Sequence, residues 1–396
     1  MADKFALFEY NTENIGDEVQ SIAARRFLPK VDYYIDRDNL SNFKSDHSVK
    51  LIMNGWYNRN PKSWPPRADS NIEPLLISMH VSQKDKQVVK SFLSPDSVEF
   101  LKKNGPVGAR DKTTEEFFIK HNIPSYFSGC VTLTLQRDPE IKKRDFILAV
   151  DVSKKIVETI KQRTNRPVIE ISVYHFPYLS REERFFVAEY FLSLYQSAAA
   201  VITTRLHAML PSLAFETPVL LIKDNKKYEA KRYAGLMELV RSATEQEFIN
   251  SSGIFKLDNP TKNPSKYKKI RESIIEKCSN FTGFNNDKTF RTIELSDGMF
   301  DVRFVRAFAF GWSSTFPKAL LEGDVAWRDQ QVEDLRTILD EERKKAKHVE
   351  ESLRKEINKQ TAYAKELNEQ LNCLYSSKSW RYTAFFRSIM KLKSNK

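Results

Sequence analysis

The chain is poor in cysteine and contains no long apolar run. Its 396 residues include only Cys130, Cys278 and Cys373, without CxxC spacing, so we expect neither a disulfide framework nor a structural zinc site. No carboxylates or histidines cluster with metal-ligand spacing, so no metal is expected. No segment is apolar for long enough to cross a bilayer, and the opening MADKFALFEY lacks the core of a signal peptide. These absences predict a cytoplasmic protein.

Acidic residues are outnumbered by basic ones. The 52 Asp and Glu stand against 64 Lys and Arg, which gives a formal net charge of +12. This excess favours anionic partners such as phosphates, nucleic acid or an acidic membrane surface. Charge alone does not choose among them, but the chain shows no nucleic-acid-binding motif, so nucleic acid is not expected. At 41% hydrophobic residues, the chain can bury two cores of ordinary size, which predicts two domains with additional segments.

Strand-like apolar runs alternate with helical patterns over the first two-thirds of the chain. In an amino-terminal lobe, residues 1–136, the pattern predicts strands at 50–57, 74–82 and 125–135 and helices at 97–105 and 113–122. A polar linker, 136–145, precedes a second lobe over 145–280, in which FILAVDV, VIEISVY, AVITT and PVLLI are the predicted strands. Such alternation is typical of parallel sheets, so the predicted fold class is α/β with two doubly wound, Rossmann-like lobes.

The last third of the chain has a different character. Residues 281–326 have no clean period and are expected to form an irregular connector. Over residues 327–374, apolar positions recur in alternating steps of four and three, with one extra step of four between Leu353 and Ile357. This pattern predicts a coiled coil that joins copies of the chain into a homo-oligomer. A lone solvated helix is the alternative, because a glutamate and a glutamine fall in the apolar seam.

A basic, aromatic tail ends the sequence. Residues 377–396 hold six Lys and Arg, no acidic residue, and interleaved large apolar side chains. A segment of this kind either lies on an anionic membrane surface or packs against its own domain. The first interpretation would place the protein peripherally at the inner face of the membrane.

An Arg-Leu-His triplet follows the predicted strand AAAVITT and opens a short predicted helix. Two such polar side chains buried unpaired inside a strand would cost roughly several kcal/mol, so a cleft at the strand end is the expected position. There Arg205 could clamp a phosphate or carboxylate, Leu206 would face the core, and His207 could exchange a proton near neutral pH. The structural alternative pairs Arg205 with an acid and uses His207 to cap the helix.

Four separated blocks resemble the polysaccharide pyruvyltransferase family. They are NIGD at 14–17, GARD at 108–111, SGCVTLT at 128–134, and the segment YQSAAAVITTRLHAMLPSLAFETPVLLI. The resemblance implies a two-lobed, glycosyltransferase-B-like architecture. It also implies an enzyme that moves the pyruvyl group of phosphoenolpyruvate to a sugar, leaving a ketal and phosphate, with no cofactor. The acceptor would be a surface polysaccharide or its lipid-linked precursor.

The same resemblance suggests roles for individual residues. Arg110 and Arg205 lie in matching motifs and would hold the carboxylate and phosphate of phosphoenolpyruvate. His207 would be the acid that protonates the enol carbon. Lys227 and Arg232 belong to a basic segment that could close on phosphate, although a solvated charge run is an equally plain interpretation.

Other candidates lie nearer the amino terminus. Asn14, Gly16 and Asp17 would start a helix facing the acceptor sugar, where Asp17 could accept a hydroxyl proton; a plain helix cap is the alternative. His80 and His175 each follow a predicted strand and could bind substrate or simply satisfy a loop.

Two other functions remain open from the sequence. A nucleotide-sugar glycosyltransferase could use the same architecture, but no Glu follows a glycine-rich turn where it could hold a ribose. A non-catalytic scaffold could instead use the coiled coil to organise a glycan-synthesis complex. Replacement of His207 separates these cases, since a scaffold would be indifferent to it.

Overall fold

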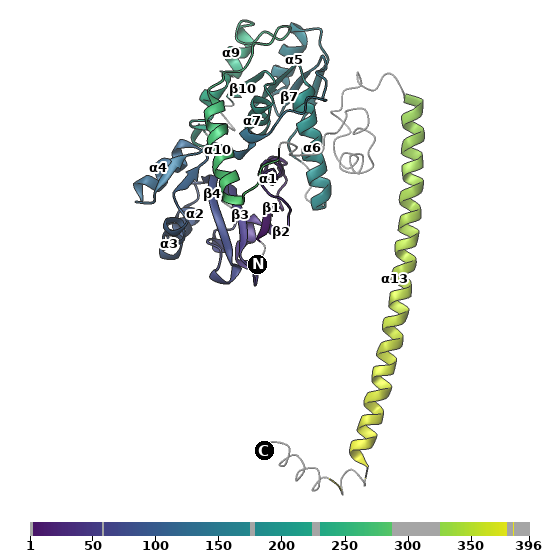
Figure 1. Ribbon diagram of the computed structural model, residues 1–396. Coiled ribbons are helices and arrows are strands. Elements are labelled where there is room, and N and C mark those ends of the chain that lie inside the picture. Colours follow the sequence, from purple (N-terminus) through teal and green to yellow (C-terminus); the bar gives the residue numbers. More distant parts are fainter. Residues whose placement is uncertain are drawn as a thin grey trace. The chain divides into compact units, whose positions relative to one another are not determined.

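The computed structural model describes residues 3–57, 59–174, 179–223, 230–286, 325–377 and 383. The chain divides into two compact units, residues 1–320 and 321–396. The first unit contains two sheets, and the second, where described, consists mainly of the long helix α13, Val325–Ser376 (Figure 1).

The first sheet has six parallel strands in the order β2-β1-β3-β4-β5-β6. The strands are β1 (Lys4–Glu9), β2 (Tyr33–Asp36), β3 (Val49–Tyr57), β4 (Ile72–Val81), β5 (Val107–Ala109) and β6 (Ser125–Phe127). Its helices are α1 (Gly16–Arg25), α2 (Lys86–Phe92), α3 (Pro95–Lys103) and α4 (Lys112–Lys120), with short 3₁₀ turns η1 (Arg37–Asn42), η2 (Pro61–Ser63), η3 (Ala68–Ser70) and η4 (Val131–Thr134).

The second sheet has five parallel strands in the order β11-β10-β9-β7-β8. The strands are β7 (Ile147–Val150), β8 (Val168–Ile171), β9 (Ala200–Thr203), β10 (Val219–Lys223) and β11 (Arg241–Thr244). The helices are α5 (Lys154–Arg163), α6 (Arg181–Ser197), α7 (Leu206–Ala214), α8 (Ala230–Tyr233), α9 (Glu245–Asn250) and α10 (Tyr267–Thr282), with the 3₁₀ turn η5 (Met237–Leu239). Two parallel sheets with intervening helices confirm the predicted α/β class.

One hydrophobic core lies between the two sheets. Side chains alternate along each strand, so Phe5 and Leu7 of β1 and Leu148 of β7 enter this shared core, whereas Phe8 and Ile147 enter separate cores on the outer faces. Helices α1, α6 and α7 and the turn η4 pack together in the middle. The two sheets are therefore parts of one packed body (Figure 1).

Helix α6 is buried over almost its whole length. Ser180 caps it through a capping box with Glu183, which fixes where the helix begins. Fifteen of its 17 residues are buried, which explains why REERFFVAEYFLSLYQS has no single apolar face. A buried hydrogen bond from Arg184 Nε to Glu18 Oε1 of α1, 2.9 Å long, joins the two halves of the unit.

The strand predicted over residues 125–135 is wrong beyond Phe127. Gly129 takes a left-handed backbone (φ 71°), which a continuing strand does not allow, and the chain turns into η4. The apolar residues that suggested a long strand, such as Val131 and Leu133, fill the shared core instead. Local periodicity did not distinguish a buried strand from a buried turn.

The C-terminal expectations are only partly visible. Residues 327–374 lie within α13, as the helical pattern predicted, and their pairing into a coiled coil stays a prediction. Most of the predicted connector 281–326 and of the tail 377–396 lies outside the described residues. Within the part of the chain that is described, no helix has the length and apolar character needed to cross a membrane.

Glu18 gives the first testable prediction. Its carboxyl is buried, Oε2 has no hydrogen-bond partner, and Asp17 is adjacent, so the pKa of Glu18 rises to about 8 despite the contact with Arg184. The stability that this shift contributes is present below the unfolded-state pKa of about 4.3 and is lost as pH rises through about 8. Glu18→Gln should remove this loss, which denaturant unfolding of both proteins at about pH 5 and about pH 9 would measure. If the free energy of unfolding changed equally with pH in the two proteins, this prediction would be contradicted.

Candidate active site

The candidate site lies where strands from both sheets end. Arg110 follows β5, His80 stands one residue before the end of β4, and the Arg-Leu-His triplet joins β9 to α7. Gly16, the first residue of α1, touches His207. Carboxyl ends of parallel strands are the usual place for ligands in such sheets, and the shared core brings two such edges together.

Arg110 carries a fully buried and unpaired guanidinium. It is 0% exposed, and its Nε, Nη1 and Nη2 atoms have no hydrogen-bond partner among the described residues. Its backbone N–H donates to the carbonyl of Met79 at 2.7 Å, which fixes the chain at this point. Burial and the nearby charge of Arg232 lower the pKa of Arg110, but a guanidinium remains charged at neutral pH. An unpaired buried cation is costly, so this side chain is suited to an anionic ligand.

His207 is held uncharged near Arg110. It is 8% exposed, and burial, followed by the charge of Arg110, lowers the pKa of His207 to about 3. Its Nε2 lies 3.8 Å from the Sγ of Cys130. A neutral imidazole accepts a proton before it can give one up, and a bound anion would raise its pKa. The acid role of His207 stays a prediction.

Gly16 allows α1 to begin directly against His207. A Cβ atom at this position would lie 2.6 Å from Nδ1 and 2.9 Å from Cβ of His207, closer than real contacts allow. The side chain of Asn14 accepts a hydrogen bond from the Gly16 N–H at 2.9 Å and so supports this turn. The glycine therefore serves a close approach between α1 and the triplet.

Hydrogen bonds from Arg37 and Thr12 occupy the carboxylate of Asp17. Its carboxylate accepts hydrogen bonds from Arg37 Nη1 at 3.0 Å and from Thr12 Oγ1 at 2.8 Å. Burial raises its pKa, but Arg37 and the Thr12 bond outweigh this, so the pKa of Asp17 is lowered overall. A carboxylate held in this way is a weak base. Its contacts favour a role in positioning neighbouring groups over the role that the sequence suggested, which was to accept a hydroxyl proton.

His80 forms a dyad with Asp111. Its Nδ1 lies 2.5 Å from Asp111 Oδ2, and the other oxygen of Asp111 accepts the N–H of Thr114 at the start of α4. Burial, followed by the charge of Arg110, lowers the pKa of His80 to about 4. The carboxylate thus orients a neutral imidazole that lies close enough to Arg110 for its charge to lower the pKa of His80.

Arg205 is paired with an acid, as the structural alternative proposed. Its Nε donates to Asp151 Oδ2 at 2.9 Å, and its Nη1 lies 3.4 Å from the hydroxyl of Tyr174, whose ring it also covers. The site thus contains one oriented guanidinium, Arg205, and one unpaired guanidinium, Arg110.

The remaining cations of the sequence prediction differ in how far they can be placed. Arg232 in α8 lies over the ring of Trp56 with its guanidinium carbon 4.6 Å from the centroid, and its Nε has no partner among the described residues. Lys227 and His175 lie outside the described residues. No group of three or more His, Cys, Asp or Glu side chains that could hold a metal ion occurs in the described ranges.

Several residues of the pocket were not predicted as site residues. Asp111 and Cys130 lie inside two of the quoted blocks, GARD and SGC, so their place in these blocks was an available signal. Trp56 and Asp151 gave no such signal, because only the folded chain brings them to Arg232 and Arg205.

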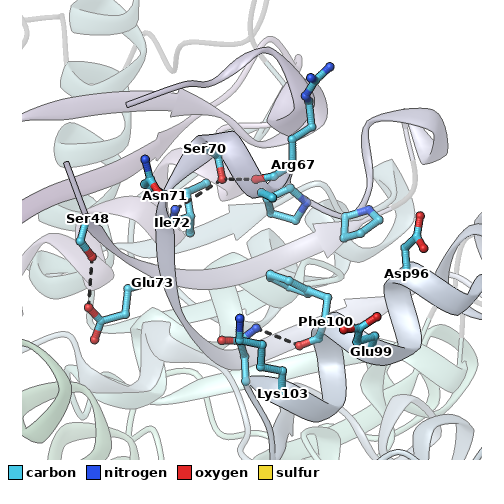
Figure 2. A pocket seen from close by; sticks show the side chains of 14 residues that line it. Ser48, Arg67, Ser70, Asn71, Ile72, Glu73, Asp96, Glu99, Phe100 and Lys103 are labelled. Carbon is cyan, nitrogen blue, oxygen red and sulfur yellow. Dashed lines mark hydrogen bonds between the residues drawn. The ribbon is translucent and has the colours of Figure 1, made fainter. Parts of the chain in front are cut away.

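A hollow lies at the other end of the strands of the first sheet, where β3 and β4 begin (Figure 2). It has a volume of about 760 Å³ and is bordered by Ser48 and Ile72 at the starts of β3 and β4. Since β4 has ten residues, its two ends are ~30 Å apart. The charged side chains of its lining are Arg67, Glu73, Asp96, Glu99 and Lys103, three acids against two bases. This balance suits an anionic ligand less well than the unpaired guanidinium of Arg110 does.

Comparison with known proteins was made at three levels. No curated protein matches the sequence. Two solved structures of the wall teichoic acid polymerase TagF match with 13% identity and a TM-score of 0.33, covering 72% of this chain and 85% of theirs. Comparison with protein families matches residues 14–225, more than half of the 396 residues, to the family described as polysaccharide pyruvyl transferase. The chain therefore belongs to the polysaccharide pyruvyl transferase family of enzymes.

Proposed function

We propose that this enzyme transfers the pyruvyl group of phosphoenolpyruvate to two hydroxyls of a sugar, forming a ketal and releasing phosphate. The acceptor is a surface polysaccharide or its lipid-linked precursor. Family membership supports pyruvyl transfer to a polysaccharide. The observation that carries the donor assignment is the buried, unpaired guanidinium of Arg110 in a pocket rich in arginine.

The donor's charge matches this pocket. Phosphoenolpyruvate combines a carboxylate with a phosphate, and a guanidinium binds either group through parallel N–H donors. Arg110 offers all of its donors, Arg232 adds a second charge from α8, and Arg205 is already oriented by Asp151. Ion pairs formed away from water are stronger than those at the surface, so a buried site favours a small, highly charged donor.

The reaction needs proton transfers within the site but no net acid or base. Two C–O bonds form to the former enol carbon and the C–O bond to phosphate breaks. One hydroxyl proton of the acceptor ends on the methylene carbon, which becomes a methyl group, and the other ends on the departing phosphate. A group that holds and releases protons near neutral pH is therefore sufficient.

The two histidines of the pocket fit this requirement. The negative charges of a bound donor raise the pKa of a neighbouring imidazole, so His207 becomes protonated when the donor binds and then supplies the proton to the enol carbon. His80, oriented by Asp111, is the second neutral imidazole and takes a proton from an acceptor hydroxyl. Gly16 and Asn14 border His207 and face the acceptor in this arrangement.

Helix α13 supports a further part of the proposal. It presents Val349, Leu353, Ile357, Leu367 and Leu371 with exposed fractions of 41 to 63% along a near-heptad spacing. Such a stripe is the seam of a coiled coil, and we propose that a second copy of the chain covers it. Attachment of the tail 377–396 to an anionic membrane, and with it a peripheral location, stays a prediction.

Arg110→Met should abolish donor binding while stabilising the protein. A methionine of similar length removes the unpaired buried charge, so the free energy of unfolding should increase by about 1–3 kcal/mol. Titration calorimetry and thermal unfolding with and without phosphoenolpyruvate would show both effects, with exposed Arg59→Met as the control. Loss of stability together with unchanged donor binding would make Arg110 a structural residue. Saturable binding of a UDP- or GDP-sugar instead of phosphoenolpyruvate would favour a glycosyltransferase.

His207→Gln should separate binding from catalysis. The amide fits the site without titrating, so phosphoenolpyruvate should still bind, while kcat falls by about 10²- to 10⁴-fold because a positioned proton donor is lost. Phosphate release and calorimetry on the same preparation would measure both. An unchanged kcat would remove His207 from the proton transfers.

Leu367→Lys combined with Leu371→Lys should dissociate the proposed oligomer. Two charges in the apolar seam oppose pairing, so the sedimentation coefficient of the full chain should fall to that of a monomer. Glu369→Lys, which changes an exposed position outside the seam, is the matched control. A wild-type chain that already sediments as a monomer would refute the pairing of α13.

A further inference from the structure

Cys130 lies between the first sheet and the triplet. It follows Gly129, whose left-handed backbone ends the strand direction of β6, and it precedes η4. Its side chain is 0% exposed and packs within the shared core. Neither the proposed donor binding nor the proposed proton transfers use this thiol, although it touches His207.

One of the two contacts of the sulfur has a defined direction. The hydroxyl of Thr132 donates to Cys130 Sγ at 3.2 Å, so the sulfur is an acceptor in that bond. The thiol proton is then available for the imidazole nitrogen Nε2 of His207, 3.8 Å away. Burial raises the pKa of the Cys130 thiol, which keeps this proton on sulfur at neutral pH.

The other imidazole nitrogen faces a different surface. Nδ1 of His207 lies against Gly16 and makes no hydrogen bond within the described part of the chain. Nδ1 is therefore the imidazole nitrogen that has no partner among the described residues and is free to bond a ligand.

We propose that Cys130 is a positioning residue that sets the tautomer of His207. A neutral imidazole carries one proton, and a nitrogen that accepts from a thiol cannot hold it. The thiol bond to Nε2 thus places the proton on Nδ1, beside Gly16. Nδ1 of His207 therefore donates a hydrogen bond to a bound ligand both when the imidazole is neutral and when it is protonated.

This arrangement has a consequence for the reaction, which rests on the proposed function. If Nε2 carried the proton instead, Nδ1 would face the donor as a lone pair and would repel its negative charges. The charged groups around the imidazole, which are Arg110, Arg232, Arg37 and Asp17, act on its pKa. Among the described residues, the contact with the Cys130 thiol is the one in which an imidazole nitrogen of His207 has a hydrogen-bond partner.

The test is the tautomer itself, read by NMR. Two-bond ¹H–¹⁵N correlation spectra of the full chain, labelled with ¹⁵N at histidine, distinguish a protonated Nδ1 from a protonated Nε2. The chain has six histidines, so the signal of His207 is identified by its loss in His207→Gln. Cys130→Ala removes the donor, Cys130→Ser restores an O–H donor, and Cys278→Ala controls for loss of a buried thiol elsewhere.

We expect wild type and Cys278→Ala to carry the His207 proton on Nδ1, Cys130→Ala to shift it to Nε2, and Cys130→Ser to restore Nδ1. The kcat of Cys130→Ala should fall by about ten- to a hundredfold, less than the roughly 10²- to 10⁴-fold that loss of the proton donor itself costs, with partial recovery in the serine variant. A wild-type proton on Nε2, or no shift in folded Cys130→Ala, would overturn the inference.

The spectra decide this question whatever the activity assay shows. If His207→Gln keeps full activity while the tautomer depends on Cys130, the proposed role of His207 fails and the assignment of Cys130 stands. If the tautomer is independent of Cys130 while His207→Gln is inactive, the reverse holds.

Discussion

A buried guanidinium without an acidic partner is the constraint around which the site is organised. Two carboxylates approach Arg110, but each is engaged elsewhere: Asp111 with His80 and the start of α4, and Asp17 with Arg37. The pocket therefore keeps its positive charge. Burial of such a charge opposes folding, and the core shared by α1, α6, α7 and η4 must supply the packing that offsets it.

The charge of Arg110 also lowers the pKa of two histidines. Burial and the charge of Arg110 keep His80 and His207 neutral. The arginines therefore supply the positive charge that attracts an anion, and the two imidazoles do not. A bound anion that offsets the charge of Arg110 would remove its lowering effect on the pKa of both rings. In the proposed function, donor binding and proton availability are thereby coupled through electrostatics.

The sequence predicts the α/β class and the strand-end position of the triplet because both depend on local periodicity. It does not reveal that Arg205 pairs with Asp151 and that Arg110 stays unpaired, since this depends on which acid reaches which cation after folding. For the same reason the apolar run after Phe127 was predicted as a strand: its burial is evident from composition, but its turn depends on the backbone of Gly129.

The contact between Gly16 and His207 ties the chemistry to the packing of the two sheets. Gly16 starts a helix of the first sheet's half, and His207 belongs to the helix that follows β9 of the second. A side chain at position 16 would have to displace the imidazole or separate α1 from α7, and either movement would also change the distance from His207 to Cys130. The shared core thus does more than join the sheets, because it holds the imidazole of His207 between Gly16 and Cys130, which neither half could do alone.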